Sequence, residues 1–184
     1  LRLVVPGWEG NVNVKWLRRL KVVDQPNMSK DETSKYTDPL AGGKARQFSF
    51  VMDVKSVITS PAHPARIDRG WREVSGLAWS GRGKVTSVDV STDGGASWEK
   101  AELQGPVQAK AHSRFRHMWN WNGRPTTIMS RATDETGAVQ PTRAVFESAR
   151  GKGTDYHFTY IRAWSVDRDG RVTFAGTGLT VPRA

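Results

Sequence analysis

The chain of 184 residues carries 28 Lys and Arg against 18 Asp and Glu, a net charge of +10, and contains no cysteine. The lack of cysteine excludes disulfides, cysteine nucleophiles and thiolate metal ligands within this chain. No apolar run approaches the roughly 18 residues of a membrane-spanning helix, and the basic residues are spread along the whole chain, so neither a membrane nor nucleic acid is expected as a partner.

The first 45 residues divide into an apolar opening and a polar stretch. Residues 1–24 are apolar and begin at Leu1 rather than at Met, which predicts a processed or truncated product that has lost any targeting segment. Residues 25–45 are polar and rich in turn residues. Because long structureless loops are uncommon inside one domain, this stretch predicts an irregular linker between two domains.

From residue 46 onward the pattern alternates with the period of two that marks half-buried strands. The first predicted strand carries Phe48, Phe50, Met52 and Val54 on one face and ends before Pro61. Further strands are predicted over residues 74–79, 85–91, 98–103, 115–119, 127–133, 144–146 and 158–166. Short strands at this spacing indicate an all-β fold, an antiparallel immunoglobulin-like sandwich, with Trp79 and Trp98 expected in its core. No long amphipathic helix is expected.

Residues 91–98 (STDGGASW) fit the Asp-box pattern S-x-D-x-G-x-x-W. In such a hairpin the Asp93 carboxylate accepts backbone N–H groups of the turn while Trp98 packs beneath, which stabilises the turn without performing chemistry. The pattern occurs once, and 184 residues are too few for a multi-bladed propeller. A glycan-binding accessory domain therefore remains only a third reading.

No self-contained active site is visible in the sequence. Among His63, His112, His117 and His157, only His112 and His117 lie near one another, and an offset of five sends strand side chains to opposite faces. These histidines are expected in the core or on the surface rather than at a metal. Nucleophile-elbow, phosphate-loop and dinucleotide motifs are absent. The adjacent carboxylates of residues 134 and 135 are explained by turn capping.

Two stretches nevertheless resemble a known family. Residues 2–17 (RLVVPGWEGNVNVKWL) are similar to the R-x-V-V-P-G-x-x-G-x-x-x-V-K-W-L segment that ends the cofactor domain of sulfite oxidases. Residues 75–98 (SGLAWSGRGKVTSVDVSTDGGASW) resemble the core of that family's dimerisation domain, and residues 131–141 match its later strand and turn. Residues 11–13 and the 25–45 linker are most similar to the bacterial sulfane dehydrogenase branch of the family.

The resemblance implies a division of the chain and a cofactor. Residues 1–24 would be the tail of a molybdopterin-binding domain, 25–45 a linker and 46–184 the dimerisation domain. The cofactor would be a molybdenum-pyranopterin, held mostly by an upstream catalytic domain that supplies a cysteine thiolate. Within this chain the resemblance assigns Arg2, Asn13 and Lys15 to the cofactor, with Arg2 and Lys15 at its phosphate end.

The resemblance also implies a substrate-channel residue, a function and partners. Arg162 is the candidate for an arginine that reaches the substrate pocket, although a register with Ala163 at that position is also open. Sulfite oxidases often carry arginine where Val12 stands, which leaves sulfane sulfur and sulfite as alternative substrates. The implied partners are a second copy of the chain, bound through the sandwich, and a c-type cytochrome in the periplasm. The rival reading is a non-catalytic immunoglobulin-like interaction module.

Overall fold

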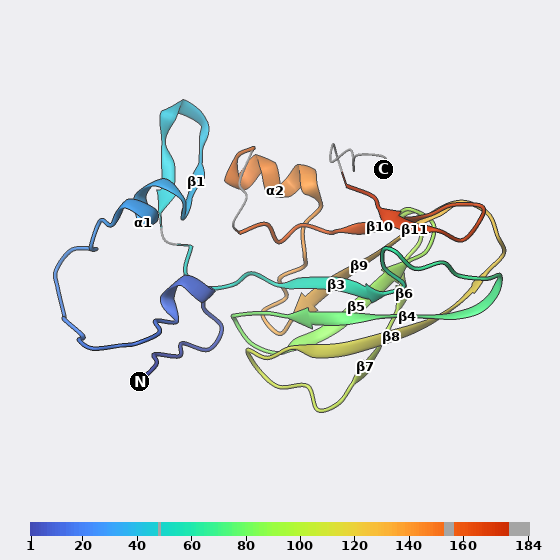
Figure 1. Cartoon of the computed structure of the whole chain (residues 1–184), viewed down its shortest axis with the longest axis horizontal. Helices are drawn as coiled ribbons and strands as arrows, with labels where there is room; N and C mark the ends of the chain where they lie inside the picture. Colours follow the sequence, from blue (N-terminus) through green and yellow to red (C-terminus); the bar gives the residue numbers. More distant parts are fainter. Residues whose placement is uncertain (48, 153–156, 177–184) are drawn as a thin grey trace.

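The fold was analysed in a computed structural model that describes residues 1–47, 49–152 and 157–176. Two antiparallel sheets form a β-sandwich, and the N-terminal segment with a short hairpin lies beside one end of it (Figure 1). The predicted all-β sandwich is therefore confirmed.

One sheet has four strands in the order β3-β4-β8-β7. Their bounds are β3 Lys55–Ser60, β4 Gly70–Trp79, β7 Glu102–Gln104 and β8 Ser113–Trp121. Alternate residues of β4 are buried between the sheets, among them Val74, Gly76 and Ala78. Gly76 has no room for a side chain, because a Cβ there would lie 2.1 Å from the Val57 carbonyl oxygen and 2.5 Å from the Phe115 ring.

The other sheet has five strands in the order β11-β10-β9-β5-β6. Their bounds are β5 Val85–Ser91, β6 Glu99–Lys100, β9 Thr126–Asp134, β10 Ala163–Val166 and β11 Val172–Phe174. Val88, Val90 and Ile128 are almost completely buried and face the first sheet. The β-branched residues suit this packing because their stiff side chains fill a pleated, half-buried surface.

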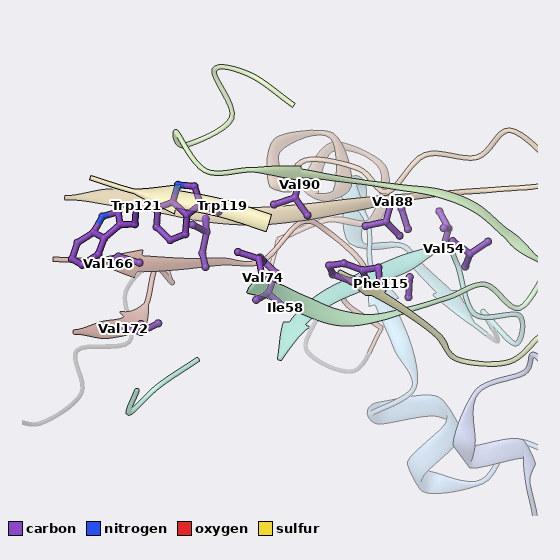
Figure 2. Packing of buried hydrophobic residues seen from close by; sticks show 14 residues of the cluster. Val54, Ile58, Val74, Val88, Val90, Phe115, Trp119, Trp121, Val166 and Val172 are labelled. Carbon is purple, nitrogen blue, oxygen red and sulfur yellow. The ribbon is translucent and has the colours of Figure 1, made fainter. Parts of the chain in front are cut away.

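The tryptophans are arranged differently from the prediction. Trp119 and Trp121 of β8 are the buried ones and gather with Val166 and Val172 at one end of the core (Figure 2). Trp79 and Trp98, which were expected in the core, are only half-buried. Trp79 is on the face of β4 that points away from the core and meets His112 edge-on, so that expectation was wrong.

The Asp-box hairpin has the predicted form. Gly94 and Gly95 have φ values of 76° and 95°, in the left-handed region that glycine adopts readily. The Asp93 carboxylate accepts the Ser97 N–H at 2.9 Å and the Ser97 hydroxyl. These hydrogen bonds, with one from Ser91, lower the pKa of Asp93 to about 2. The indole of Trp98 is covered by the Arg131 guanidinium, 4.3 Å from its ring centre.

Two buried polar groups are satisfied within the sandwich. The Gln140 side-chain oxygen accepts the Ser56 N–H at 2.9 Å, and Ser56 also meets Ser130 of the opposite sheet at 2.9 Å. The Asp134 carboxylate accepts the Ser80 hydroxyl at 2.6 Å and the Thr136 N–H at 3.0 Å. Asp134 is therefore a turn-capping residue, as predicted.

Of the strand predicted from residue 48 to Pro61, only the second half forms, as β3. β2 (Ala45–Gln47) pairs with β1 (Thr37–Pro39) as a separate hairpin, and the next strand begins only at Lys55. Phe48 lies outside the described residues. Phe50 has a φ of 54°, which breaks an extended backbone, and its ring stacks on Trp8 at 4.9 Å instead of facing the sandwich core.

Residues 144–146, predicted as a strand, belong to the helix α2 (Arg143–Arg150). The Thr142 hydroxyl caps its N-terminus by accepting the Val145 N–H at 3.4 Å. Phe146 is the buried residue of this helix, and Val145 is 58% exposed. A triplet of apolar residues cannot distinguish a strand from a helix with one buried side chain.

The stretch predicted as an irregular linker contains regular structure. Ser29 and Glu32 form a capping box at the start of α1 (Lys30–Ser34). The 3-10 turns η1 (Gly10–Val12) and η2 (Ala41–Gly43) and the β1-β2 hairpin complete the N-terminal region. The predicted domain boundaries at residues 24 and 45 stay predictions.

Candidate functional site at the junction with the sandwich

A pocket of about 300 Å³ lies where the N-terminal segment meets the sandwich. It opens between the turn η1, the start of β3, the end of β4 and the segment 157–159. Its lining residues are Glu9, Gly10, Asn11, Tyr36, Met52, Asp53, Lys55, Trp79, His157, Phe158 and Thr159. A concave, largely apolar site with a few polar groups is the usual form of a small-ligand site.

Backbone hydrogen bonds fix the N-terminal segment against the sandwich. The Met52 N–H donates to the Gly7 carbonyl at 2.9 Å, and the Glu9 N–H donates to the Phe50 carbonyl at 2.7 Å. Gly7 has a φ of 84°, and a Cβ there would lie 2.5 Å from the Gly81 carbonyl oxygen. The close approach of three chain segments thus depends on glycine at positions 7 and 81.

A cluster of charged residues lies beside the pocket, with Arg150 at its centre. The Arg150 guanidinium contacts the Asp38 carboxylate at 2.7 Å and the Asp53 carboxylate at 2.5 Å. Arg82 approaches Asp53 from the solvent side at 3.3 Å. Burial alone would raise the pKa of Asp53, but hydrogen bonds from His157 and the charge of Arg150 lower it well below its usual range. Asp38 is fully buried, which is tolerable because it is paired.

His157 connects this cluster to the N-terminal segment. It is 5% exposed, its Nδ1 contacts the Glu9 carboxylate, and its Nε2 lies 3.6 Å from the Asp53 carboxylate. Burial alone would lower the pKa of His157, but its hydrogen bonds with Asp53 and Glu9 raise that pKa above the usual value. Protonated His157 therefore bridges two carboxylates that come from different parts of the chain.

Lys55 forms another wall of the pocket. Its ammonium donates to the Phe158 carbonyl at 2.8 Å, lies 4.3 Å from the Phe158 ring centre and 5.9 Å from that of Trp79. Burial and the nearby charge of Arg162 lower the pKa of Lys55 to about 8. This amine is therefore partly neutral in mildly alkaline solution.

Of the predicted cofactor residues, Arg2 and Lys15 are brought together. They face each other across an isolated antiparallel bridge, and both are exposed. Asn13 lies two positions before Lys15, and its side chain is turned to the backbone, where it accepts the Val5 N–H at 2.8 Å and donates to the Glu9 carbonyl at 2.9 Å. The structure therefore gives Asn13 the role of holding the loop that positions its neighbours.

Arg162, the predicted substrate-channel residue, lies just before β10 and does not line the pocket. Its guanidinium donates to the Tyr160 hydroxyl and stacks on the Phe174 ring at 4.4 Å and on the Phe158 ring at 5.3 Å. Arg162 and Lys55 therefore both contact the ring of Phe158, which lines the pocket.

Sequence reasoning missed Asp53, Lys55, Arg150 and His157 as site residues. Asp53 and Lys55 are separated from Arg150 and His157 by about a hundred positions. Only packing of the sandwich brings the two pairs together. No local motif marked them. Among the described residues no group of three or more His, Asp or Glu could hold a metal ion. No helix in the described ranges is long and apolar enough to span a membrane.

Comparison with known families divides the chain near the place where the sequence pattern changes. A model described as the Mo-co oxidoreductase dimerisation domain matches residues 46–162. A second model, described as the oxidoreductase molybdopterin binding domain, matches residues 1–31. The pocket therefore has walls from both matched regions, since Glu9 and Gly10 lie within residues 1–31 and Lys55 and His157 within residues 46–162.

Several known proteins are similar to this chain over most of its length. It is 32% identical over 155 residues to mitochondrial sulfite oxidase of Mus musculus, covering 77% of this chain and 28% of that protein. Sulfite oxidase of Gallus gallus is 32% identical over 154 residues, covering 77% of this chain and 34% of that protein. The solved sulfane dehydrogenase SoxCD from Paracoccus pantotrophus superposes with a TM-score of 0.89 at 50% identity, over 94% of this chain and 45% of that one.

The chain thus spans about a third or less of these sulfite oxidases and less than half of the solved sulfane dehydrogenase chain. The match over residues 46–162 and the 32% identity over most of the chain agree with the β-sandwich in the structure. The chain belongs to the sulfite oxidase family of molybdenum-cofactor oxidoreductases, and residues 46–162 are its dimerisation domain.

Proposed function

We propose that this chain is the dimerisation portion of a molybdenum-cofactor oxidoreductase that oxidises reduced sulfur, as sulfane sulfur or sulfite. One observation carries the proposal. The chain is 50% identical to the sulfane dehydrogenase SoxCD over 94% of its length, against 32% identity to mouse sulfite oxidase over 77%. Sulfane sulfur is accordingly the favoured substrate class, with sulfite as the alternative.

Arg2 and Lys15 are the residues of this chain that would hold the molybdenum-pyranopterin cofactor. Two exposed cations directly opposite each other repel, and a phosphate between them would remove that repulsion. Asn13 would keep the loop in the shape that presents them, through its bonds to Val5 and Glu9. When bound, the cofactor supplies oxygen-atom transfer to sulfur and accepts the electrons.

The remaining assignments of this proposal concern the channel and the partners. Arg162 is proposed near the substrate channel, which is supported by a guanidinium that pairs with no carboxylate of the described residues. We propose a homodimer formed through the sandwich, an upstream catalytic domain with the molybdenum-ligating cysteine, and a c-type cytochrome that receives the electrons. A periplasmic location fits such a partner.

The test is turnover by the full-length enzyme. Purified protein that includes the upstream domain is expected to reduce cytochrome c when supplied with a sulfane donor such as thiosulfate, or with sulfite. The 184-residue chain alone is expected to give no turnover, because it has no cysteine for molybdenum. Activity of the isolated chain, or a full-length enzyme that is loaded with molybdenum and oxidises neither sulfur compound, would overturn the proposal.

A further inference from the structure

The pocket at the junction contains an unbalanced positive charge. Lys55 points its ammonium at the Phe158 carbonyl and ring, and no carboxylate of the described residues forms an ion pair with it. Arg162, whose charge reaches Lys55, contacts a phenol and aromatic rings. Lys55 is therefore a cation in the pocket wall, Arg162 adds positive charge from behind that wall, and both have neutral contacts among the described residues.

The two carboxylates that line the same pocket are already engaged. Asp53 contacts Arg82, Arg150 and His157, and Glu9 contacts His157. Their negative charge is thus balanced inside the cluster, which leaves Lys55 as the charged group available to a ligand. An anion is the ligand that complements this wall.

The other walls restrict what kind of anion fits. Met52, Trp79 and Phe158 present apolar surface, and a pocket of about 300 Å³ admits a small molecule. A strongly hydrated anion would lose much of its hydration there, whereas a large, polarisable sulfur anion loses less. We propose that this pocket is an anion subsite in which Lys55 holds a sulfur anion that is less strongly hydrated than sulfate, such as thiosulfate. The identity of the anion rests on the proposed function.

Binding at this subsite is coupled to protonation of Lys55. The other titratable groups that line the pocket are Glu9, Tyr36, Asp53 and His157, and the charge of Arg162 acts on Lys55 from outside the lining. An anion against the ammonium favours its charged form, so binding takes up a proton near pH 8, where the free amine is partly neutral. Affinity for the anion is therefore expected to fall as the pH rises above about 8.

The experiment measures thiosulfate binding to the full-length enzyme by calorimetry, with sulfate as the hydrated comparison anion. Wild type is expected to bind thiosulfate more tightly than sulfate, and more tightly at pH 7 than at pH 9.5. Lys55→Gln should weaken thiosulfate binding about tenfold or more. Lys55→Arg keeps its charge at both pH values, so it should bind with little pH dependence. Lys100→Gln, an exposed lysine outside the pocket, is the matched control.

A second measurement covers the case in which Lys55→Gln disturbs folding. Limited acetylation followed by mass spectrometry should show that thiosulfate protects Lys55 in the wild-type enzyme and leaves Lys100 unprotected. Equal thiosulfate affinity in wild type and Lys55→Gln, or no protection of Lys55, would overturn the subsite. Lys55-dependent binding in an enzyme that oxidises no sulfur compound would instead support the subsite and contradict the proposed function.

Discussion

At the scale of single residues, the N-terminal segment places two positive charges, those of Arg2 and Lys15, directly opposite each other. Arg2 and Lys15 lie opposite each other across the bridge, and the backbone bond from the Leu3 N–H to the Val14 carbonyl, 2.9 Å long, holds the two segments together. Like charges in directly opposed positions destabilise a pair of strands. Their juxtaposition does not stabilise the segment, which supports the proposed role of the two residues in holding the cofactor's phosphate.

Lys15→Ala in the full-length enzyme should lower molybdenum content more than it lowers fold stability. A charge-assisted contact with a phosphate is worth about 1.5–3 kcal/mol, or roughly tenfold to a hundredfold in affinity. Loss of an exposed lysine changes stability by only about half a kcal/mol. Molybdenum per protomer and the melting temperature of the apoprotein separate the two effects, with exposed Lys21→Ala as control. Unchanged molybdenum content would show that Lys15 has no cofactor role.

His157→Gln should remove a pH-dependent part of the stability. The folded-state pKa of His157 is raised, so its contribution is complete below the unfolded value of about 6.5 and is lost as the pH rises through the folded pKa. At pH 6 the variant is expected to lose up to about 3–5 kcal/mol, because the buried Glu9 loses its charged partner, whereas the half-buried Asp53 keeps Arg150. Thermal unfolding at pH 6 and pH 8 measures this. A destabilisation of equal size at both pH values would contradict the bridging role.

At the scale of elements, α2 brings Arg150 to the site. The helix starts at the Thr142 cap and ends at Gly151, which has φ 83° and ψ 166°, a conformation essentially restricted to glycine. A Cβ at Gly151 would lie 1.7 Å from the Pro39 carbonyl oxygen of the β1-β2 hairpin. The end of the helix and the hairpin that supplies Asp38 therefore fit together only with glycine at this position.

Gly151→Ala should destabilise the protein more than Gly137→Ala. Both glycines have a φ near 82°, which costs a side chain about 1–2 kcal/mol, and the ψ of 166° at Gly151 adds to that cost. At Gly137 no heavy atom lies within 4 Å of an added Cβ, whereas at Gly151 the hairpin must move. Urea unfolding of the two variants measures the clash together with the additional backbone strain at Gly151. Equal midpoints would mean that the hairpin shifts without cost and that Arg150 does not depend on this contact.

At the scale of the whole molecule, the matched dimerisation domain and the eight tryptophans of the chain predict self-association through the sandwich. Light scattering of the full-length enzyme at tens of micromolar is expected to give the mass of a dimer. The isolated chain should dimerise as well, but more weakly if the upstream domain contributes to the contact. A full-length enzyme that stays monomeric at this concentration would contradict the assignment.

Much of the sandwich could be predicted from the sequence alone, because the signals there are local. The strand at 85–91 and the Asp-box turn were predicted at the places where they form, since alternation and turn glycines act over a few residues. The family resemblance was carried by two contiguous motifs and is confirmed by the matched models. The first half of the strand predicted from residue 48 and the strand predicted at 144–146 failed, because the alternating pattern does not reveal which partner each apolar side chain will meet.

The sequence by itself determined the fold class and the family, and it placed Arg2 and Lys15 only 13 positions apart within one motif. The structure then showed that these two residues face each other across a bridge. Which residues meet at the junction pocket was decided only by the tertiary structure. Lys55 meets the Phe158 carbonyl across 103 positions, and Arg150 meets Asp53 across 97. Such contacts leave no periodic or spacing signal, because they arise when hydrophobic burial joins the two sheets and the charged groups at their edge must then find partners.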